Sequence, residues 1–149
     1  MAALPLVAWT EGRALVATGS PFPAVAYQGR TIPISQCNNA YVFPGVGLGV
    51  IASGARRVTD EMFLAAARVL SDSVPPQTGC DAPLLPPLAE IRAVSRRIAL
   101  AVGREAQRQG LAPHTSLQEW EHLLDARQWE PRYRPMRPQR PGTPWVTTG

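Results

Sequence analysis

The fold is decided by two stretches, Ala-Leu-Val-Ala-Thr-Gly-Ser-Pro-Phe at residues 14–22 and Gln-Cys-Asn-Asn-Ala-Tyr-Val-Phe-Pro-Gly-Val-Gly-Leu-Gly at residues 36–49. The first begins with a short apolar run bounded by glycines, which is the pattern of a strand buried on both faces in a parallel sheet. Open α/β sheets place their ligands at the carboxyl ends of such strands, so the Gly19–Ser20 turn is a candidate cofactor edge. A plain loop of turn-forming residues is an equal alternative.

The second stretch holds two adjacent asparagines, Asn38 and Asn39, just before an apolar segment. Pro44 and Gly45 predict that this segment begins a helix, which we expect to run to about Ser53. An amide side chain offers donors and an acceptor without a charge, so the pair is suited to holding a carboxylate and a carboxamide. From the residues alone, helix capping or an Asx turn is the favoured alternative.

The Gly-rich helix is not a dinucleotide-binding fingerprint, because no strand directly precedes it and its glycine spacing is wrong. We expect its glycines instead to allow close packing against a neighbouring backbone. Three further helices are predicted, one capped by Thr59, one over 88–109 that ends at Gly110, and one opened by the capping box Ser116-Leu-Gln-Glu119. Their expected inward-facing residues include Met62, Phe63, Val94, Ile98, Val102, Leu117, Trp120 and Leu124.

Length and charge narrow the possible classes of protein. The 149 residues suffice for one domain, which we expect over 1–130, followed by a Pro/Arg-rich, mostly disordered tail over 131–149. All 15 basic residues are Arg, and the four in the tail account for the net charge of +4. The neutral body gives no basic stripe, so we expect no nucleic-acid partner.

Other classes are disfavoured by what the residues lack. The longest apolar run is shorter than the ~20 residues of a membrane-spanning helix, and no secretory leader is recognisable, so we expect no membrane partner and a cytoplasmic location. Cys37 and Cys80 form no CxxC motif, and His114 and His122 have no second ligand at helical spacing. No metal site is therefore expected in this chain.

Taken together, the quoted stretches resemble the C-terminal part of the malic enzymes. The likeness runs in order from about residue 9 to 135 and continues through Arg57-Val-Thr-Asp60, Leu85-Pro-Pro-Leu88, Ile91-Arg-Ala-Val-Ser95 and Trp129-Glu-Pro-Arg-Tyr133. The resemblance implies an α/β fold, namely the C-terminal part of a Rossmann-like dinucleotide-binding domain. We expect one or two short parallel strands and about four helices, with an incomplete sheet.

Malic enzymes oxidatively decarboxylate malate to pyruvate with NAD or NADP and a divalent metal, Mg or Mn. Their metal-binding acids, catalytic Lys and Gly-rich turn lie upstream of the matched region, and this chain contains no Lys. The resemblance therefore implies substrate binding by Asn39, substrate or nicotinamide contact by Asn38, and cofactor contact by Gly19 and Ser20. It implies no catalytic residue and no metal ligand here, and the isolated chain is expected to be inactive.

Three functions remain to be distinguished. The first is a C-terminal fragment of a malic enzyme that works with an N-terminal malic enzyme chain or as a homo-oligomer. The second is a non-catalytic remnant that acts as an oligomerisation or interaction module. The third, a small Arg-tailed nucleic-acid or anion binder, is disfavoured by the neutral body.

Overall fold

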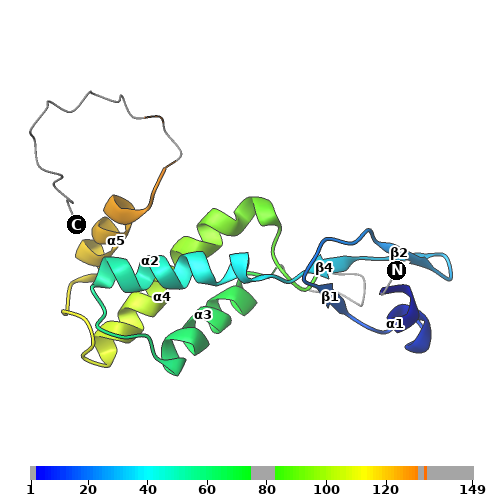
Figure 1. The fold of residues 1–149 in the computed structure, drawn as a ribbon, viewed down its shortest axis with the longest axis horizontal. Coiled ribbons are helices and arrows are strands. Elements are labelled where there is room, and N and C mark those ends of the chain that lie inside the picture. Colours follow the sequence, from blue (N-terminus) through cyan, green and yellow to red (C-terminus); the bar gives the residue numbers. More distant parts are fainter. Residues whose placement is uncertain (1–2, 75–82, 131–132, 134–149) are drawn as a thin grey trace, which may run out of the picture.

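A small sheet region and a bundle of helices lie next to each other along the long axis of the molecule (Figure 1). The computed structural model describes residues 3–74, 83–130 and 133. The sheet region precedes the bundle in the chain, and the segment after strand β4 (Ile34–Gln36) leads directly from one to the other. The predicted tail over 131–149 and Cys80 lie outside the described residues, apart from Tyr133.

The sheet region contains one parallel and one antiparallel pair of strands. Strand β1 (Val16–Thr18) pairs in parallel with β4, with Val16 opposite Ile34 and Thr18 opposite Gln36. Strands β2 (Val25–Tyr27) and β3 (Arg30–Ile32) form a hairpin around Gln28 and Gly29. Both turn residues have positive φ, 48° and 76°, as a two-residue hairpin turn of the I′ type requires.

A short helix, α1 (Ala3–Trp9), covers one face of this region, although the sequence showed no strong pattern there. Ala3 and Val7 of α1 pack against Val16 and Ile32, and all four are buried. The sheet residues therefore have an apolar core of their own, separate from that of the bundle.

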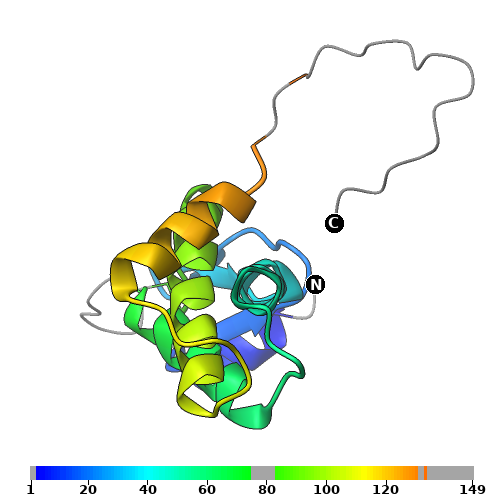
Figure 2. The ribbon, with the colours of Figure 1, turned by 90° about the vertical axis from the view of Figure 1, so that its left-hand side faces the viewer.

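The bundle consists of helices α2 (Phe43–Ser53), α3 (Asp60–Asp72), α4 (Ile91–Arg108) and α5 (Leu117–Arg127), with single 3-10 turns at Asn39–Tyr41 and Leu88–Glu90. The predicted caps are confirmed: Thr59 Oγ1 accepts from the Met62 N–H, and Ser116 and Glu119 form a complete capping box. The long α4 runs through the middle and packs on both α2 and α3 (Figure 2). Its buried residues Val94, Ile98 and Val102 form the centre of the bundle core.

Glycines set the distance between α2 and α4. A Cβ at Gly45 would lie 2.7 Å from the Ile98 side chain, and a Cβ at Gly49 would lie 2.8 Å from the Ala99 carbonyl oxygen. Both distances are too short for any side chain, whereas Gly47 on the same helix faces open space. The expected close packing is therefore confirmed, and it offsets the cost of glycine in a helix.

A polar network ties the start of α3 to the end of α4. Gln109 Nε2 donates to Thr59 Oγ1 at 3.1 Å and to Glu105 Oε1 at 2.6 Å. The Arg108 guanidinium donates to both oxygens of the Glu105 carboxylate. Hydrogen bonds from Arg108 first, and then from Gln109, lower the pKa of Glu105 to about 2.

Three expectations from the sequence are wrong in detail. Phe63 is 41% exposed and contacts the Phe43 ring edge-on, and Leu117 is 54% exposed, so neither belongs to the core. Strand β1 is buried on one face only, since Ala17 is exposed.

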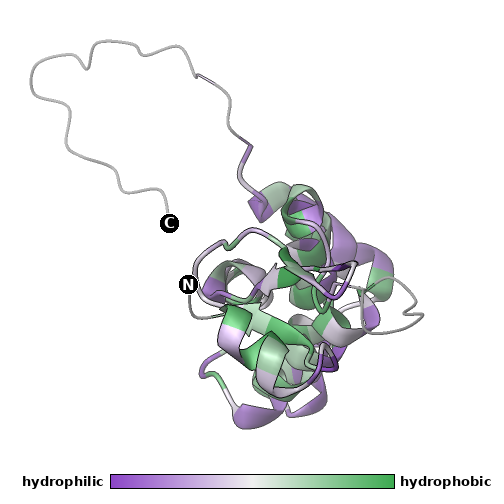
Figure 3. Cartoon of the chain, turned by 90° about the vertical axis from the view of Figure 1, so that its right-hand side faces the viewer, coloured by the Kyte–Doolittle hydropathy of each residue, from purple (hydrophilic) through white to green (hydrophobic). Residues whose placement is uncertain are grey.

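The expected α/β class with an incomplete parallel sheet is confirmed. Figure 3 shows the molecule from the end that carries the sheet, with hydrophilic residues in purple and hydrophobic residues in green. Among the described helices, none has both the length and the apolar content to cross a membrane.

Candidate functional site

The two parallel strands bring the candidate residues to one edge of the sheet. Thr18 and Gln36 are the last residues of β1 and β4 and lie opposite each other in the ladder. The Cys37 N–H extends this ladder by donating to the Thr18 carbonyl at 2.8 Å. The chain segments that begin with Gly19 and with Asn38 therefore leave the sheet at the same carboxyl edge, where open α/β sheets bind ligands.

The turn after β1 is exposed at this edge. Thr18 Oγ1 donates to the Ser20 carbonyl at 2.8 Å and so fixes the path of the turn. Gly19 and Ser20 are both exposed, and no heavy atom lies within 4 Å of the position that a Cβ at Gly19 would occupy. The space above Gly19 is thus open to a ligand.

The two asparagines differ in their hydrogen bonding. Asn38 caps the 3-10 turn, with its Oδ1 accepting from the Ala40 N–H at 2.9 Å, as the capping alternative predicted. The cap uses the oxygen and leaves the Nδ2 group of Asn38 as a donor. Asn39 is exposed, and its side chain makes no hydrogen bond within the described residues. The edge therefore presents one donor-only amide and one amide with both functions free.

Hydrogen bonds of two buried side chains hold this edge in place. The Tyr41 hydroxyl donates to the Pro86 carbonyl at 2.7 Å, and Ser35 Oγ accepts from the Leu84 N–H at 2.8 Å. Burial raises the pKa of Tyr41, and the negative charge of Cys37 when ionised raises it further. Tyr41 and Ser35 thus fasten both sides of the Asn38–Asn39 segment to the chain that leads into α4.

The described residues do not suit a divalent metal. No group of three or more His, Cys, Asp or Glu side chains gathers anywhere in residues 3–74, 83–130 and 133. Acidic oxygens are the ligands that Mg²⁺ prefers, and the carboxyl edge offers only neutral amides and a hydroxyl. A metal bound at this edge would need ligands other than the side chains of the described residues.

A match to a family model decides the family. The description "Malic enzyme, NAD binding domain" matches residues 2–107 of this chain. The chain belongs to the malic enzyme family. The NAD-dependent malic enzyme of Proteus mirabilis is 55% identical over 129 residues, and that of Pectobacterium atrosepticum is 54% identical over the same length. Each alignment covers 87% of this chain but only 23% of the relative, so the chain spans less than a quarter of these relatives.

Solved malic enzyme structures agree with the fold. The enzyme of Pyrococcus horikoshii superposes with a TM-score of 0.59 at 26% identity, over 79% of this chain and 25% of that one. The enzyme of Entamoeba histolytica gives the same TM-score at 23% identity, over 79% and 23% of the two chains, which supports the fold alone.

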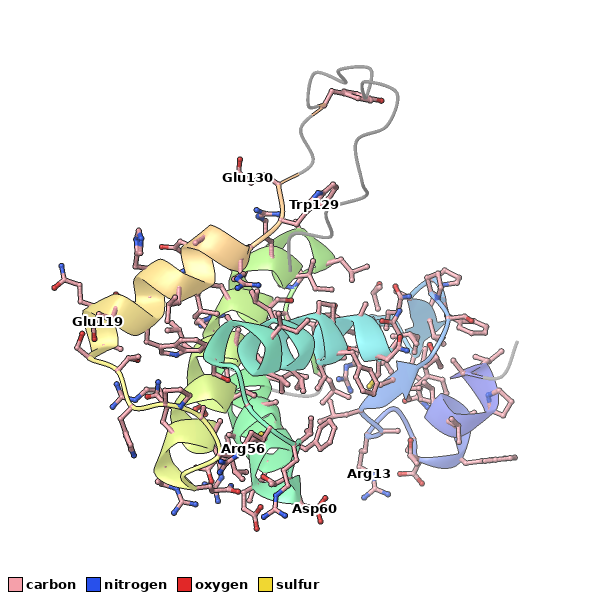
Figure 4. All side chains as sticks on the ribbon, turned by 60° about the vertical axis from the view of Figure 1, so that its left-hand side comes forward. Arg13, Arg56, Asp60, Glu119, Trp129 and Glu130 are labelled. Carbon is pink, nitrogen blue, oxygen red and sulfur yellow. The ribbon has the colours of Figure 1, made fainter. Side chains whose placement is uncertain are left out.

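Sequence reasoning missed two features near the edge. It gave no role to Tyr41 or Ser35, whose partners lie more than 40 positions away in the chain. It also missed a largely apolar groove of about 400 Å³ beside the 3-10 turn at Asn39–Tyr41. The groove is lined by residues that include Ala40, Pro44, Ile91 and Trp129. Figure 4 shows Trp129 at the end of the last helix, far along the chain from Ala40. No local pattern could have revealed a groove made from so many elements.

Proposed function

We propose that this malic enzyme family chain supplies one wall of the pocket in which malate and the nicotinamide of NAD bind. The observation that carries the proposal is the parallel pairing of β1 and β4, which brings the Gly19–Ser20 turn and the Asn38–Asn39 pair to the same edge. Ligands bind at this edge in open α/β sheets. The names of the relatives, NAD-dependent malic enzymes, support NAD rather than NADP as the cofactor.

Asn39 binds the substrate carboxylate in this proposal. Its exposed amide has two free donors, and it can orient a carboxylate without adding charge next to the metal of a complete site. Asn38 contributes its Nδ2 donors to a carbonyl or carboxylate oxygen of malate or of the nicotinamide amide, because its own oxygen is used by the cap. The cap also fixes the orientation of that donor in advance of binding.

Gly19 and Ser20 contact the cofactor. Open space over Gly19 lets a ligand approach the backbone closely, which a side chain at this position would prevent. The Ser20 hydroxyl adds a donor or an acceptor at the same place. The bound cofactor would supply hydride acceptance, while these residues would hold and orient it.

The remaining groups come from other polypeptide. Oxidative decarboxylation needs a base for the hydroxyl proton and an electrophile for the ketone, and this chain has neither a Lys nor a described cluster of metal ligands. We therefore predict that the purified chain alone shows no malate-dependent reduction of NAD or NADP with Mg²⁺ or Mn²⁺. Absorbance at the reduced-nicotinamide band measures this directly, and detectable turnover would contradict the prediction.

A complementation assay tests the roles of the asparagines. The chain is co-expressed with Proteus mirabilis NAD-dependent malic enzyme from which the 129 matched residues are deleted, and malate kinetics are measured on the complex. We expect Asn39→Ala to lower kcat/KM for malate by about 10- to 100-fold, the effect of losing a hydrogen bond to a charged group. Gln118→Ala, which removes an exposed amide on α5, serves as the control. Equal malate kinetics for both variants would refute the proposed role of Asn39.

The second candidate function, a non-catalytic interaction module, is favoured by large exposed apolar side chains such as Leu4, Trp9 and Ile51. Exposed apolar side chains that gather in one contiguous patch mark surfaces that bind other polypeptide. The same assay separates the two functions, because a module forms the complex without restoring malate oxidation.

A further inference from the structure

The two halves of the proposed pocket lie on different parts of the molecule. The Gly19–Ser20 turn follows β1 in the sheet region, whereas Asn39 begins the 3-10 turn that leads into α2 of the bundle. The sheet region and the bundle have separate apolar cores, and no described residue belongs to both. Neither core by itself therefore fixes the distance between the Gly19–Ser20 turn and Asn39.

A second segment of the chain passes the junction between the sheet region and the bundle. Figure 1 shows it in green, leading into α4 beside the chain that runs from β4 to α2. Its Leu84 N–H donates to Ser35 Oγ in the sheet at 2.8 Å, and two residues later its Pro86 carbonyl accepts from the Tyr41 hydroxyl at 2.7 Å. One short length of chain is thus bonded to the sheet at one point and to the start of the bundle at the next.

This second segment is stiff where it is bonded. Pro86 is followed by Pro87, so φ is fixed at both residues and Pro86 is restricted to an extended backbone. The Pro86 side chain is fully buried and Tyr41 is 3% exposed, so water has little access to the hydrogen bond between them. A stiff segment with a buried bond at its end can hold the junction at one angle.

Tyr41 is closely connected to both asparagines. It ends the 3-10 turn that begins at Asn39, and its N–H donates to the Asn38 carbonyl at 3.3 Å. The Asn38 side chain accepts from the Ala40 N–H within the same turn. A displacement of Tyr41 would therefore move the Asn39 amide, which lies only two residues away.

We propose that Tyr41 and Ser35 are positioning residues for the malate and nicotinamide pocket. Their hydrogen bonds to Pro86 and Leu84 hold Asn39 at the distance from the β1 turn that ligand binding requires. Both hydroxyls bond to the backbone of buried chain, so they act on the ligand through Asn39. A displacement of about 1 Å in a group that holds substrate can lower catalytic efficiency by up to about 100-fold. This inference rests on the proposed function.

Malate kinetics in the complementation assay test the positioning role. Tyr41→Phe keeps the ring and removes the hydroxyl, and we expect kcat/KM for malate to fall about tenfold, with the larger part of the change in KM. Ser35→Ala should act in the same direction. Ser116→Ala is the matched control, because it destabilises the chain to a similar degree at the end of the bundle away from the sheet, where Figure 4 labels its capping partner Glu119. It should leave KM unchanged.

Hydrogen exchange on the full chain tests the same connection without catalysis. The Ala40 N–H is bonded to the Asn38 side chain and reports on the 3-10 turn directly. It should exchange about tenfold faster in Tyr41→Phe than in Ser116→Ala, since global destabilisation affects both variants alike. Equal exchange of this amide in the two variants would overturn the inference, and so would equal values of KM for malate.

A double variant shows whether Tyr41 acts through Asn39. If it does, Tyr41→Phe should change kcat/KM by less than about twofold once Asn39→Ala is present, because coupled residues give non-additive effects. Two independent losses that multiply would overturn the inference. If Asn39→Ala instead matches its Gln118→Ala control, the proposed substrate role fails, whereas an effect of Asn39→Ala without one of Tyr41→Phe refutes the positioning role alone.

Discussion

Replacing Gly103 by alanine is the sharpest test of how the bundle is packed. A Cβ at this position would lie 2.0 Å from Cζ2 of Trp120 and 2.6 Å from two further indole atoms. Trp120 is fully buried, and its indole N–H donates to the Leu100 carbonyl at 3.1 Å. The rigid indole is thus fixed to α4 by this hydrogen bond, and its own helix α5 holds it in place, so it has little freedom to move.

The expected loss of stability follows from the overlap. Carbon atoms in contact rest about 3.5–4.0 Å apart, so Trp120 or α5 must move by about 1.5 Å to admit the methyl group. Overpacking of this kind costs about 3 kcal/mol at the upper end of its range, and the better helix propensity of alanine returns about 1 kcal/mol. We expect Gly103→Ala to lower the free energy of unfolding by about 2 kcal/mol, or the Tm by roughly 8 °C.

Urea denaturation followed by circular dichroism at 222 nm measures this difference. Gly47→Ala is the control, because it makes the same chemical change within α2 at a site where the added methyl group meets open space. It should be neutral or stabilise by up to about 1 kcal/mol. If Gly103→Ala were as stable as Gly47→Ala, the close contact between α4 and α5 would be refuted.

Three more predictions concern local contacts. Ser116→Ala removes the capping box of α5 and should cost about 1 kcal/mol of unfolding free energy, with loss of helical signal as the readout. Tyr41→Phe leaves the buried Pro86 carbonyl without its donor and should cost about 1–2 kcal/mol in urea titration, whereas no change would show that water replaces the hydroxyl. Glu105→Gln should make the free energy of unfolding depend less on pH below about pH 4.3. The folded pKa of about 2 lies below the unfolded value of about 4.3, so the stabilisation is present above pH 4.3 and lost as pH falls toward 2. Tm values measured from pH 6 to pH 2 should fall more steeply for the unaltered chain than for the variant, and parallel curves would contradict this.

The candidate site could be predicted only in part. The residue types of Asn38, Asn39, Gly19 and Ser20 made them candidates, and their roles remain predictions. The sequence also raised the capping alternative, and the structure adopts it for Asn38 without occupying its Nδ2 group. Which amide stays free could not be read from the sequence, because both asparagines precede the helix and only backbone geometry chooses the cap.

The sequence by itself determined the helices of the bundle and their caps. These depend on contacts between residues three or four positions apart, such as those within the Ser116–Glu119 box, and local patterns record such contacts. It also predicted that glycines allow α2 to pack closely against a neighbour. It did not distinguish Gly45 and Gly49, which do so, from Gly47, which faces open space.

Only the tertiary structure decided which distant residues meet. The parallel pairing of β1 with β4, the hydrogen bond from Tyr41 to Pro86 and the insertion of Trp120 over Gly103 each join segments separated by many residues. Such contacts depend on how whole elements pack, and no local sequence pattern specifies that. The same reason explains Phe63 and Leu117, whose apolar character predicted burial but whose positions on their helices face away from the core.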